Sequence, residues 1–501
     1  MPQSAPTTLA AVDLGSNSFH LQIARVVNHQ LYPLDSHKET VRLGGGVTAD
    51  KKIDAPTATR ALEALKLFAE RLRGMPPGAV RVVGTNALRV AKNAQDFLRE
   101  AEKALGFPIE IISGREEARL IYLGVAHSLP VSNHNRLVMD IGGGSTEFII
   151  GYGLKPKAAE SLYMGCVTYS QRFFPDGKID KKNFKQAELA AQRETEAISA
   201  RFKKLGWKEA IGSSGTAKAL AGILEENRQS DGTITLVGLE WLKSQALKAG
   251  SFADLKLPGL RDDRVMVLPG GLAIMLAAFQ ELGLKRMTLA DSALRQGVLY
   301  DLLGRSHHAD IRDSSVELLA KRYHVDLLQA ERVNALALRF LKQLNAAFDP
   351  KESESDYRLM QVLKWAARLH EIGIDIAQSA FHKHSAYIIA NADLPGFSRQ
   401  EQAWLAKLVL AQRGKLAKVS ADLKSDHDVR VLAFCLRIAV LLYRSRRAID
   451  VKQFDVEMQG DGFGLRVKQA WLAEHSLTEY GLKTEAAEWE GLGFRLEIAE
   501  V

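Results

Sequence analysis

Two glycine-rich loops of the same pattern constrain the fold of this chain more than any other feature. Each loop follows an apolar stretch that ends in aspartate, Asp13 in the first case and Asp140 in the second. The loops read Asp-Leu-Gly-Ser-Asn-Ser and Asp-Ile-Gly-Gly-Gly-Ser-Thr-Glu, and an apolar segment follows each of them. This pattern predicts a strand, a tight turn and a returning strand. Its repetition predicts a duplicated α/β fold.

The same loops are suited to bind phosphate. Glycine lets the backbone come close to an anion, and successive N–H and hydroxyl groups can then hold it. A strand-end aspartate can hold a divalent metal ion or its waters, although such an aspartate is often only a turn former. One loop opens each half of residues 9–303, so the two halves are expected to close on a polyanion from both sides.

Length and composition predict a multidomain globular protein. The chain has 501 residues, too many for one core, with 46% hydrophobic and 25% charged residues. We find no apolar run long enough to cross a membrane and no secretory signal at the N-terminus. The two cysteines, Cys166 and Cys435, are too few for a disulfide framework. A cytoplasmic location is therefore expected.

The net charge of +8 favours an anionic partner. The basic excess lies mainly in residues 1–301, the part that contains both loops. Such a balance would fit nucleic acid equally well, but the chain lacks the interleaved aromatic and basic modules of nucleic-acid readers. We therefore expect a phosphorylated small molecule or polymer as substrate, and no nucleic acid.

Several motifs resemble those of the exopolyphosphatase/guanosine pentaphosphate phosphohydrolase family, a branch of the actin-like fold shared with sugar kinases and Hsp70 ATPases. The matching segments are residues 12–20, 84–89, 111–120, 140–147, 164–167, 212–216 and 293–297. The resemblance implies an α/β fold of duplicated actin-like (ribonuclease H-like) domains, followed by a helical HD-like domain and a small C-terminal α/β domain. The expected boundaries are 1–124, 125–303, 304–447 and 448–501.

The resemblance assigns the role of catalytic base to Glu117, the second acid of the pair Glu116-Glu117. A carboxylate near a bound terminal phosphate can accept a proton from the attacking water. Without the resemblance, both acids would simply favour the N-terminus of a helix. We expect Glu116 to have only that supporting role.

Magnesium is the expected cofactor, because a hard cation binds carboxylate, water and phosphate oxygens and neutralises charge during phosphoryl transfer. The candidate ligands or water holders are Asp13, Asp140 and Glu147. Glu147 could equally lie on the solvent face of its strand. The resemblance also allows stimulation by a monovalent cation such as K⁺.

Phosphate binding is expected from the loops and from one arginine. The candidates are Ser16, Asn17, Ser18, Arg89, Gly143, Gly144, Ser145, Thr146, Gly212, Ser214 and Gly215. Arg89 could clamp a phosphate through two parallel hydrogen bonds, or could be a surface arginine. The loop at residues 212–216 could contact further phosphates or a nucleotide.

Residues 366–373 and 381–387 resemble a decayed HD phosphohydrolase core. A working core has adjacent histidine and aspartate, whereas this chain has His370 followed by Glu371. We therefore expect no metal-dependent catalysis in this region.

The expected function is release of orthophosphate from the end of inorganic polyphosphate. The same site in this family can accept guanosine pentaphosphate (pppGpp) and produce guanosine tetraphosphate (ppGpp), which links it to the stringent response. Residues 140–145 and 382–387 look closer to the exopolyphosphatase versions and favour polyphosphate. The alternatives are a non-hydrolytic nucleotide or alarmone regulator, which would not need Glu117, and an actin-like kinase. The long C-terminal helices make a homodimer the expected oligomer, and the expected location is cytoplasmic or peripheral at the inner membrane.

Overall fold

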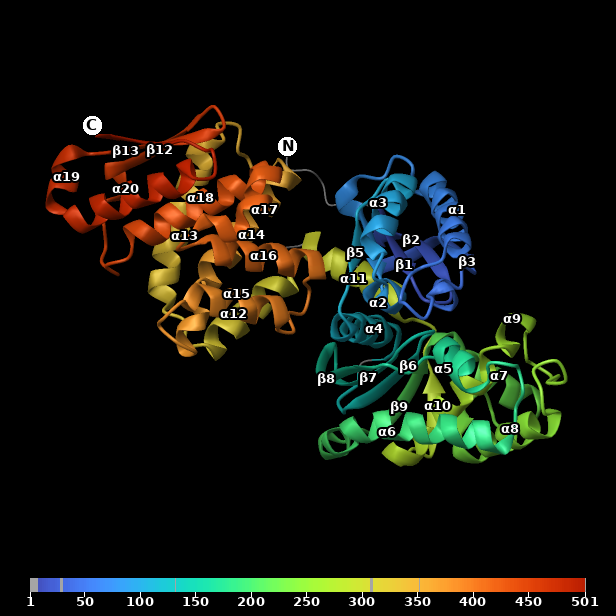
Figure 1. Ribbon diagram of the computed structural model, residues 1–501. Helices are drawn as coiled ribbons and strands as arrows, with labels where there is room; N and C mark the ends of the chain where they lie inside the picture. Colours follow the sequence, from blue (N-terminus) through green and yellow to red (C-terminus); the bar gives the residue numbers. More distant parts are fainter. Residues whose placement is uncertain (1–7, 28–29, 131, 307–309, 351, 501) are drawn as a thin grey trace. The chain divides into compact units, whose positions relative to one another are not determined.

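The computed structural model describes residues 8–27, 30–130, 132–306, 310–350 and 352–500. The chain divides into two compact units, Ser4–Asp310 and Ile311–Val501 (Figure 1). Both glycine-rich loops lie in the first unit. None of the helices in the described ranges is both long and apolar enough to cross a lipid bilayer.

The first sheet of the N-terminal unit has five strands in the order β3-β2-β1-β4-β5. Strand β2 pairs antiparallel with β1 and β3, whereas β4 is parallel to β1 and β5 is parallel to β4. The bounds are β1 Thr8–Leu14, β2 Phe19–Val27, β3 Gln30–Glu39, β4 Val80–Gly84 and β5 Ile109–Ile111.

The second sheet repeats this arrangement. Strand β7 pairs antiparallel with β6 and β8, whereas β9 is parallel to β6 and β11 is parallel to β9. The short strand β10 adds an antiparallel edge next to β11. The bounds are β6 Arg136–Ile141, β7 Thr146–Tyr152, β8 Lys155–Leu162, β9 Glu209–Ser213, β10 Ile234–Thr235 and β11 Arg286–Leu289. The predicted duplication is confirmed: β6 and β7 take the places that β1 and β2 have in the first half.

Helices cover both sheets. α1 and α3 pack on one face of the first sheet, whereas α4 and α11 contribute to a core shared by β1 and the second sheet. Accordingly, α4 lies between the two sheets in Figure 1. The bounds are α1 Ala55–Leu72, α2 Asn86–Val90, α3 Ala94–Leu105, α4 Gly114–Ser128, α5 Cys166–Phe173, α6 Lys181–Leu205, α7 Ser214–Glu226, α8 Leu236–Ala249, α9 Asp262–Val265, α10 Leu268–Leu282 and α11 Leu294–Ser306.

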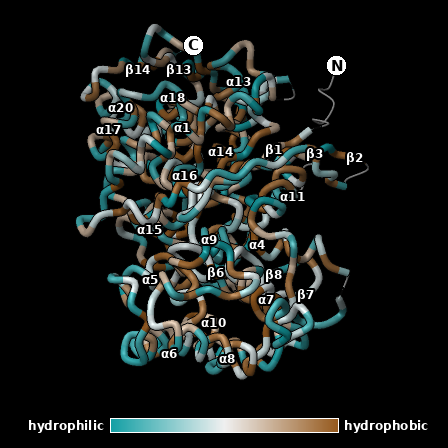
Figure 2. The backbone as a smooth tube through the Cα atoms, turned by 90° about the vertical axis from the view of Figure 1, so that its right-hand side faces the viewer, coloured by the Kyte–Doolittle hydropathy of each residue, from teal (hydrophilic) through white to brown (hydrophobic). Residues whose placement is uncertain are grey.

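The second half is built around helix α10, which is buried along nearly its whole length. Its long neighbour α6 is amphipathic, with a largely hydrophilic outer face (Figure 2). An all-apolar helix is stable only in a core, so α6 and the sheet shield α10 from water. This packing fixes the strands that carry the second loop.

Helices α4 and α11 cross at two glycines. A Cβ atom at Gly297 would lie 1.8 Å from the carbonyl oxygen of Leu120, and one at Gly124 would lie 2.1 Å from that of Ala293. Only glycine permits so close an approach of two backbones. As a result α11, which comes from the end of the unit, packs back against the helix that carries Glu117.

The second unit combines helices and a three-stranded sheet in the order β12-β13-β14. One hydrophobic core contains side chains from both, including Phe434 of α18, Phe463 of β13 and Trp489 of α20. The bounds are α12 Ile311–Arg322, α13 Leu327–Leu344, α14 Glu354–Leu369, α15 Phe381–Asn391, α16 Arg399–Ala411, α17 Ser420–Ser425, α18 His427–Leu442, β12 Phe454–Gln459, β13 Gly462–Val467, α19 Gln469–Glu474, α20 Ser476–Glu490 and β14 Leu496–Glu500.

Two of the three predicted domain limits fall inside helices, and the third falls between segments that share one core. The limit between residues 124 and 125 lies inside α4, and the limit between 303 and 304 lies inside α11. The limit between 447 and 448 separates segments that share one hydrophobic core. Segments distant in sequence therefore complete each other's cores.

Candidate active site

Glu117 lies in the first turn of α4. Ser113 caps this helix, because its hydroxyl oxygen accepts a hydrogen bond from the Glu116 backbone N–H at 3.2 Å. Such capping is typical of a serine directly before a helix. The Glu117 carboxylate is largely buried and accepts a hydrogen bond from Arg89 Nη1 at 2.7 Å. Arg89 Nη1 also donates to the Ile112 carbonyl oxygen at 3.0 Å, which fixes the guanidinium against the strand end.

The two glycine-rich loops meet face to face. An ideal Cβ at Gly143 would lie 3.0 Å from Ser16 Cβ and 3.4 Å from the Asn17 backbone nitrogen. A Cβ at Gly144 would lie 2.4 Å from Asn86 Oδ1. Side chains at these positions would push the loops apart. The glycines therefore leave backbone N–H groups from both halves accessible to one ligand.

A cleft with a volume of ≈ 700 Å³ lies between the loops. This volume is in the range of small-molecule and nucleotide sites. Of the residues expected from the sequence, the cleft is lined by Asp13, Ser16, Asn17, Ser18, Glu117, Asp140, Gly143, Gly144, Ser145, Ser214 and Gly215. The two glycine-rich loops and Glu117 thus line one cleft.

Four expected residues lie outside the cleft lining. Arg89 is held behind Glu117, and the buried Glu147 accepts a hydrogen bond from Ser161 Oγ at 2.7 Å. Thr146 donates its hydroxyl to the Met164 carbonyl oxygen at 2.5 Å. A Cβ at Gly212 would lie 2.9 Å from Met287 Sδ, so this glycine serves packing. In this structure Arg89 Nη1 contacts the Glu117 carboxylate, and a contact between Arg89 and phosphate stays a prediction.

Glu116 is part of a buried ionic cluster. Its two carboxylate oxygens accept hydrogen bonds from Arg119, each at 2.8 Å. Asp301 of α11 accepts hydrogen bonds from Arg119 at 2.5 Å and from Arg81 at 2.6 Å. Glu116 lies in the first turn of α4, as expected for a residue that supports the start of the helix, and its side chain also helps to tie α4 to α11.

Burial raises the pKa values of the carboxyl groups around the cleft. The pKa of Asp13 is raised to about 7, mainly by burial; Arg295 opposes this shift, whereas the negative charges of Glu117 and Asp140 add to it. Burial likewise raises the pKa of Asp140 to about 6, although a hydrogen bond from Ser213 Oγ at 2.6 Å opposes it. Burial also raises the pKa of Glu147 well above its ordinary value. An added cation would relieve this concentration of negative charge.

The cleft fits a magnesium ion shared with a phosphorylated substrate. In the described part of the chain, no three or more His, Cys, Asp or Glu side chains are arranged to hold a metal by themselves. Mg²⁺ usually takes only one or two protein carboxylates and completes its shell with water and substrate phosphates. Asp13 suits this role because its buried Oδ1 has no hydrogen-bond partner among the residues that the structure describes. Asp140 is the second candidate, whereas Glu147 lies outside the lining.

The cleft also contains cations that the sequence analysis did not single out. They are Lys38, Arg261, Arg264 and Arg295. Lys218 and His20 also line the cleft, but burial lowers the pKa of His20 to about 3, so this imidazole is neutral near pH 7. Arg295 belongs to the segment 293–297, which carried the family resemblance without a role for any side chain. Lys38, Arg261 and Arg264 come from segments with no distinctive pattern, whereas His20 ends the matching segment 12–20.

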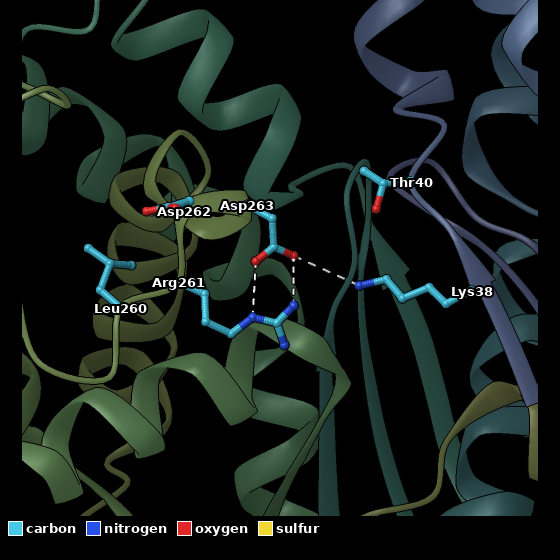
Figure 3. Close-up of a pocket in the computed structure, with 6 residues that line it drawn as sticks. All are labelled: Lys38, Thr40, Leu260, Arg261, Asp262 and Asp263. Carbon is cyan, nitrogen blue, oxygen red and sulfur yellow. Dashed lines mark hydrogen bonds and ion pairs between the residues drawn. The ribbon is translucent and has the colours of Figure 1, made fainter.

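One of these cations bridges the two halves at the edge of the cleft (Figure 3). Lys38 of β3 lies 3.9 Å from Asp263 of α9, and Arg261 donates to the same carboxylate at 3.1 Å. These residues border a side pocket of ≈ 590 Å³. The pair thus brings a side chain of the first half next to one of the second half at this edge, although a partly exposed pair of this length contributes little stability.

In the second unit, the HD-like segments form a buried histidine site. His370 Nδ1 hydrogen-bonds the Ala367 carbonyl oxygen at 2.7 Å, and its Nε2 lies 3.9 Å from Glu371. The Glu371 carboxylate accepts a hydrogen bond from Arg446 at 2.6 Å. Neighbouring groups thus engage both residues of the pair.

Comparisons with known proteins agree with this architecture. The Ppx/GppA phosphatase family matches residues 22–306, and domain III of the Ppx/GppA phosphatases matches residues 311–486. A guanosine-5'-triphosphate,3'-diphosphate pyrophosphatase from Aeromonas hydrophila is 39% identical over 494 residues, which are 98% of each chain.

Two solved structures share the fold of the N-terminal unit. A Ppx/GppA family member from Aquifex aeolicus is 26% identical, with a TM-score of 0.51 over 60% of this chain and 99% of its own. An exopolyphosphatase from Cytophaga hutchinsonii is also 26% identical, with a TM-score of 0.53 over 60% of this chain and 98% of its own. The expected actin-like fold with a helical C-terminal region is confirmed. The chain belongs to the Ppx/GppA phosphatase family, and is a phosphoanhydride hydrolase.

Proposed function

We propose that the principal substrate is pppGpp, from which the chain removes the 5'-terminal phosphate to give ppGpp and orthophosphate. The observation that supports this most directly is the Aeromonas relative, which aligns over 98% of both chains. The exopolyphosphatase from Cytophaga hutchinsonii aligns with only 60% of this chain. The comparisons thus favour pppGpp as the substrate, whereas the sequence motifs favoured polyphosphate. Inorganic polyphosphate is proposed as a second substrate of the same cleft.

The geometry supports hydrolysis through a water molecule activated by Glu117. Glu117 Oε2 is engaged by Arg89, whereas Oε1 has no hydrogen bond within the described ranges. Oε1 can accept a proton as the water oxygen bonds to the terminal phosphorus. The bond between that phosphorus and the bridging oxygen breaks, and the bridging oxygen leaves on the shortened nucleotide. Arg89 keeps the carboxylate oriented throughout.

The loops would bind the phosphates while this happens. Residues Ser16–Ser18 and Gly143–Ser145 line the same cleft, and their backbone N–H groups and hydroxyls can hold non-bridging oxygens. Asp13 and Asp140 would hold Mg²⁺, which when bound supplies positive charge next to the phosphates. A non-hydrolytic regulator would not need a base placed in this way.

The test is product analysis with purified full-length protein and Mg²⁺. We expect pppGpp to yield ppGpp and orthophosphate in equal amounts, without pyrophosphate. Binding of pppGpp without turnover would instead support the regulator. Turnover of polyphosphate with intact pppGpp would make the chain an exopolyphosphatase only.

A further inference from the structure

Arg295 is a cation in the cleft whose guanidinium no side chain of the described residues holds by a hydrogen bond or ion pair. It lies in the first turn of α11 and lines the cleft together with Asp13 and Glu117. Over the described ranges, its guanidinium makes no hydrogen bond and no ion pair. A guanidinium carries five N–H donors and stays charged in proteins. Removing such a group from water without an anion is unfavourable, so its position favours a ligand that supplies one.

The other arginines around the site each have an acidic partner in the described part of the chain. Arg261 and Arg264, which also line the cleft, lie 3.1 and 3.9 Å from Asp263. Arg89 is paired with Glu117, Arg119 with Glu116 and Asp301, and Arg81 with Glu110 and Asp301. Each of these is explained by a structural partner. Arg295 instead has Asp13 as an electrostatic neighbour, and Asp13 itself keeps a buried oxygen without a partner.

The fold holds Arg295 in a fixed relation to Glu117. The crossing of α4 and α11 at Gly124 and Gly297 lets the two backbones touch. The ion pair between Arg119 of α4 and Asp301 of α11, at 2.5 Å, joins the same helices a turn or two further on. On the opposite side, Gln22 of β2 donates to Gln296 Oε1 at 3.0 Å. The start of α11 is thereby fastened to both the base-bearing helix and the first sheet.

We propose that Arg295 is a further catalytic residue, which binds non-bridging oxygens of the phosphoryl group that is transferred to water. This inference rests on the proposed function, because it names a role within that reaction. During phosphoryl transfer negative charge is spread over the three equatorial oxygens, and the planar guanidinium matches two of them. Arg295 makes and breaks no covalent bond. It stabilises charge while Glu117 accepts the proton.

The test compares Arg295→Gln, Arg295→Lys and Arg295→Ala in the full-length chain, with Arg286→Gln as a matched control. Arg286 lies on β11, more than half exposed and paired with Asp231, away from the cleft. We expect Arg295→Gln to lower kcat/KM for pppGpp by about 10²–10³-fold, as is typical for loss of one preorganised donor at a developing charge. Most of the loss should fall on kcat. Arg295→Lys should retain an intermediate rate, and Arg286→Gln should resemble the wild type.

Two further measurements separate contact with substrate from a structural role. Guanidinium ion at non-denaturing concentration should partly restore Arg295→Ala and leave the wild type unchanged. Inorganic phosphate should raise the unfolding temperature of the wild type more than that of Arg295→Gln. Near wild-type kinetics for Arg295→Gln would overturn the proposal, as would a loss that neither lysine nor guanidinium restores. If the wild type cleaves no phosphoanhydride, the proposed function fails, but the phosphate measurement still decides whether Arg295 binds phosphate.

Discussion

Arg89 Nη1 lies 2.7 Å from Glu117 Oε2, so a buried arginine holds one oxygen of the proposed base. This relationship predicts that Glu117→Gln keeps its place while losing the ability to accept a proton. We expect kcat to fall by about 10²–10⁴-fold, with substrate binding retained. Steady-state phosphate release and a direct binding measurement check this. The control is Glu63→Gln, which makes the same change on the exposed face of α1. Equal turnover of Glu117→Gln and wild type would refute the assignment.

The buried cluster around Asp301 predicts a stability effect. Asp301 accepts hydrogen bonds from Arg81, Arg119 and Arg305, so Asp301→Asn leaves buried cations underpaired. Losing one partner of a buried pair typically costs about 3–5 kcal/mol. Amide hydrogen exchange of α4 and α11 should therefore accelerate. Asp96→Asn, which breaks an exposed pair with Arg99, is the control and should cost less than about 1 kcal/mol.

The same cluster has a defined pH dependence. Desolvation opposes ionisation of Asp301, but its arginine neighbours outweigh this effect and hold its pKa well below the ordinary value. The stabilisation is therefore present above the unfolded-state pKa and is lost only as the pH falls through the lower folded-state pKa. We therefore expect amide hydrogen exchange in α4 and α11 to be faster in Asp301→Asn than in the wild type, both at pH 5 and at pH 8. An effect of Asp301→Asn confined to alkaline pH would contradict it.

Asp13 predicts the opposite pH dependence in metal-free protein. Burial raises its pKa from 3.8 to about 7, so the folded state binds the proton more tightly than the unfolded state. Stability should decline as the pH rises from about 4 to about 7. Asp13→Asn should therefore raise the unfolding temperature more at pH 8 than at pH 4, measured with a chelator present. Saturating Mg²⁺ should shrink the gain at pH 8. A gain that is the same at both pH values would show that Asp13 does not titrate in this range.

We expect the activity to depend on a metal ion bound in the N-terminal unit, and not on the HD-like segments of the second unit. A chelator should abolish activity and Mg²⁺ should restore it, and Asp140→Asn should require more Mg²⁺ for half-maximal rate. His370→Ala should not change that requirement, because neighbouring groups engage the pair His370-Glu371. The measurement is phosphate release against Mg²⁺ concentration. If His370→Ala has the same effect as chelation, the HD-like segments hold a working metal site.

The sequence predicted the parts of the site that depend on local pattern. Asp13 and Asp140, each at the end of an apolar strand and followed by glycine, were placed in one cleft because the duplicated halves repeat. Other contacts depend on residues that are distant in the chain, such as Arg89 with Glu117 and Arg119 with Asp301. No local periodicity encodes which arginine meets which carboxylate. Helix α11 returns from residue 294 to the first sheet, and this return brings the unpartnered Arg295 into the cleft.

The most direct test is the ratio of kcat/KM for pppGpp to that for the ends of long-chain polyphosphate, measured on the full-length protein with Mg²⁺ and with ATP as a reference. We predict a ratio above one, with both activities abolished together in Glu117→Gln. A ratio well below one would restore polyphosphate as the main substrate. Full activity of Glu117→Gln on either substrate would contradict the common cleft.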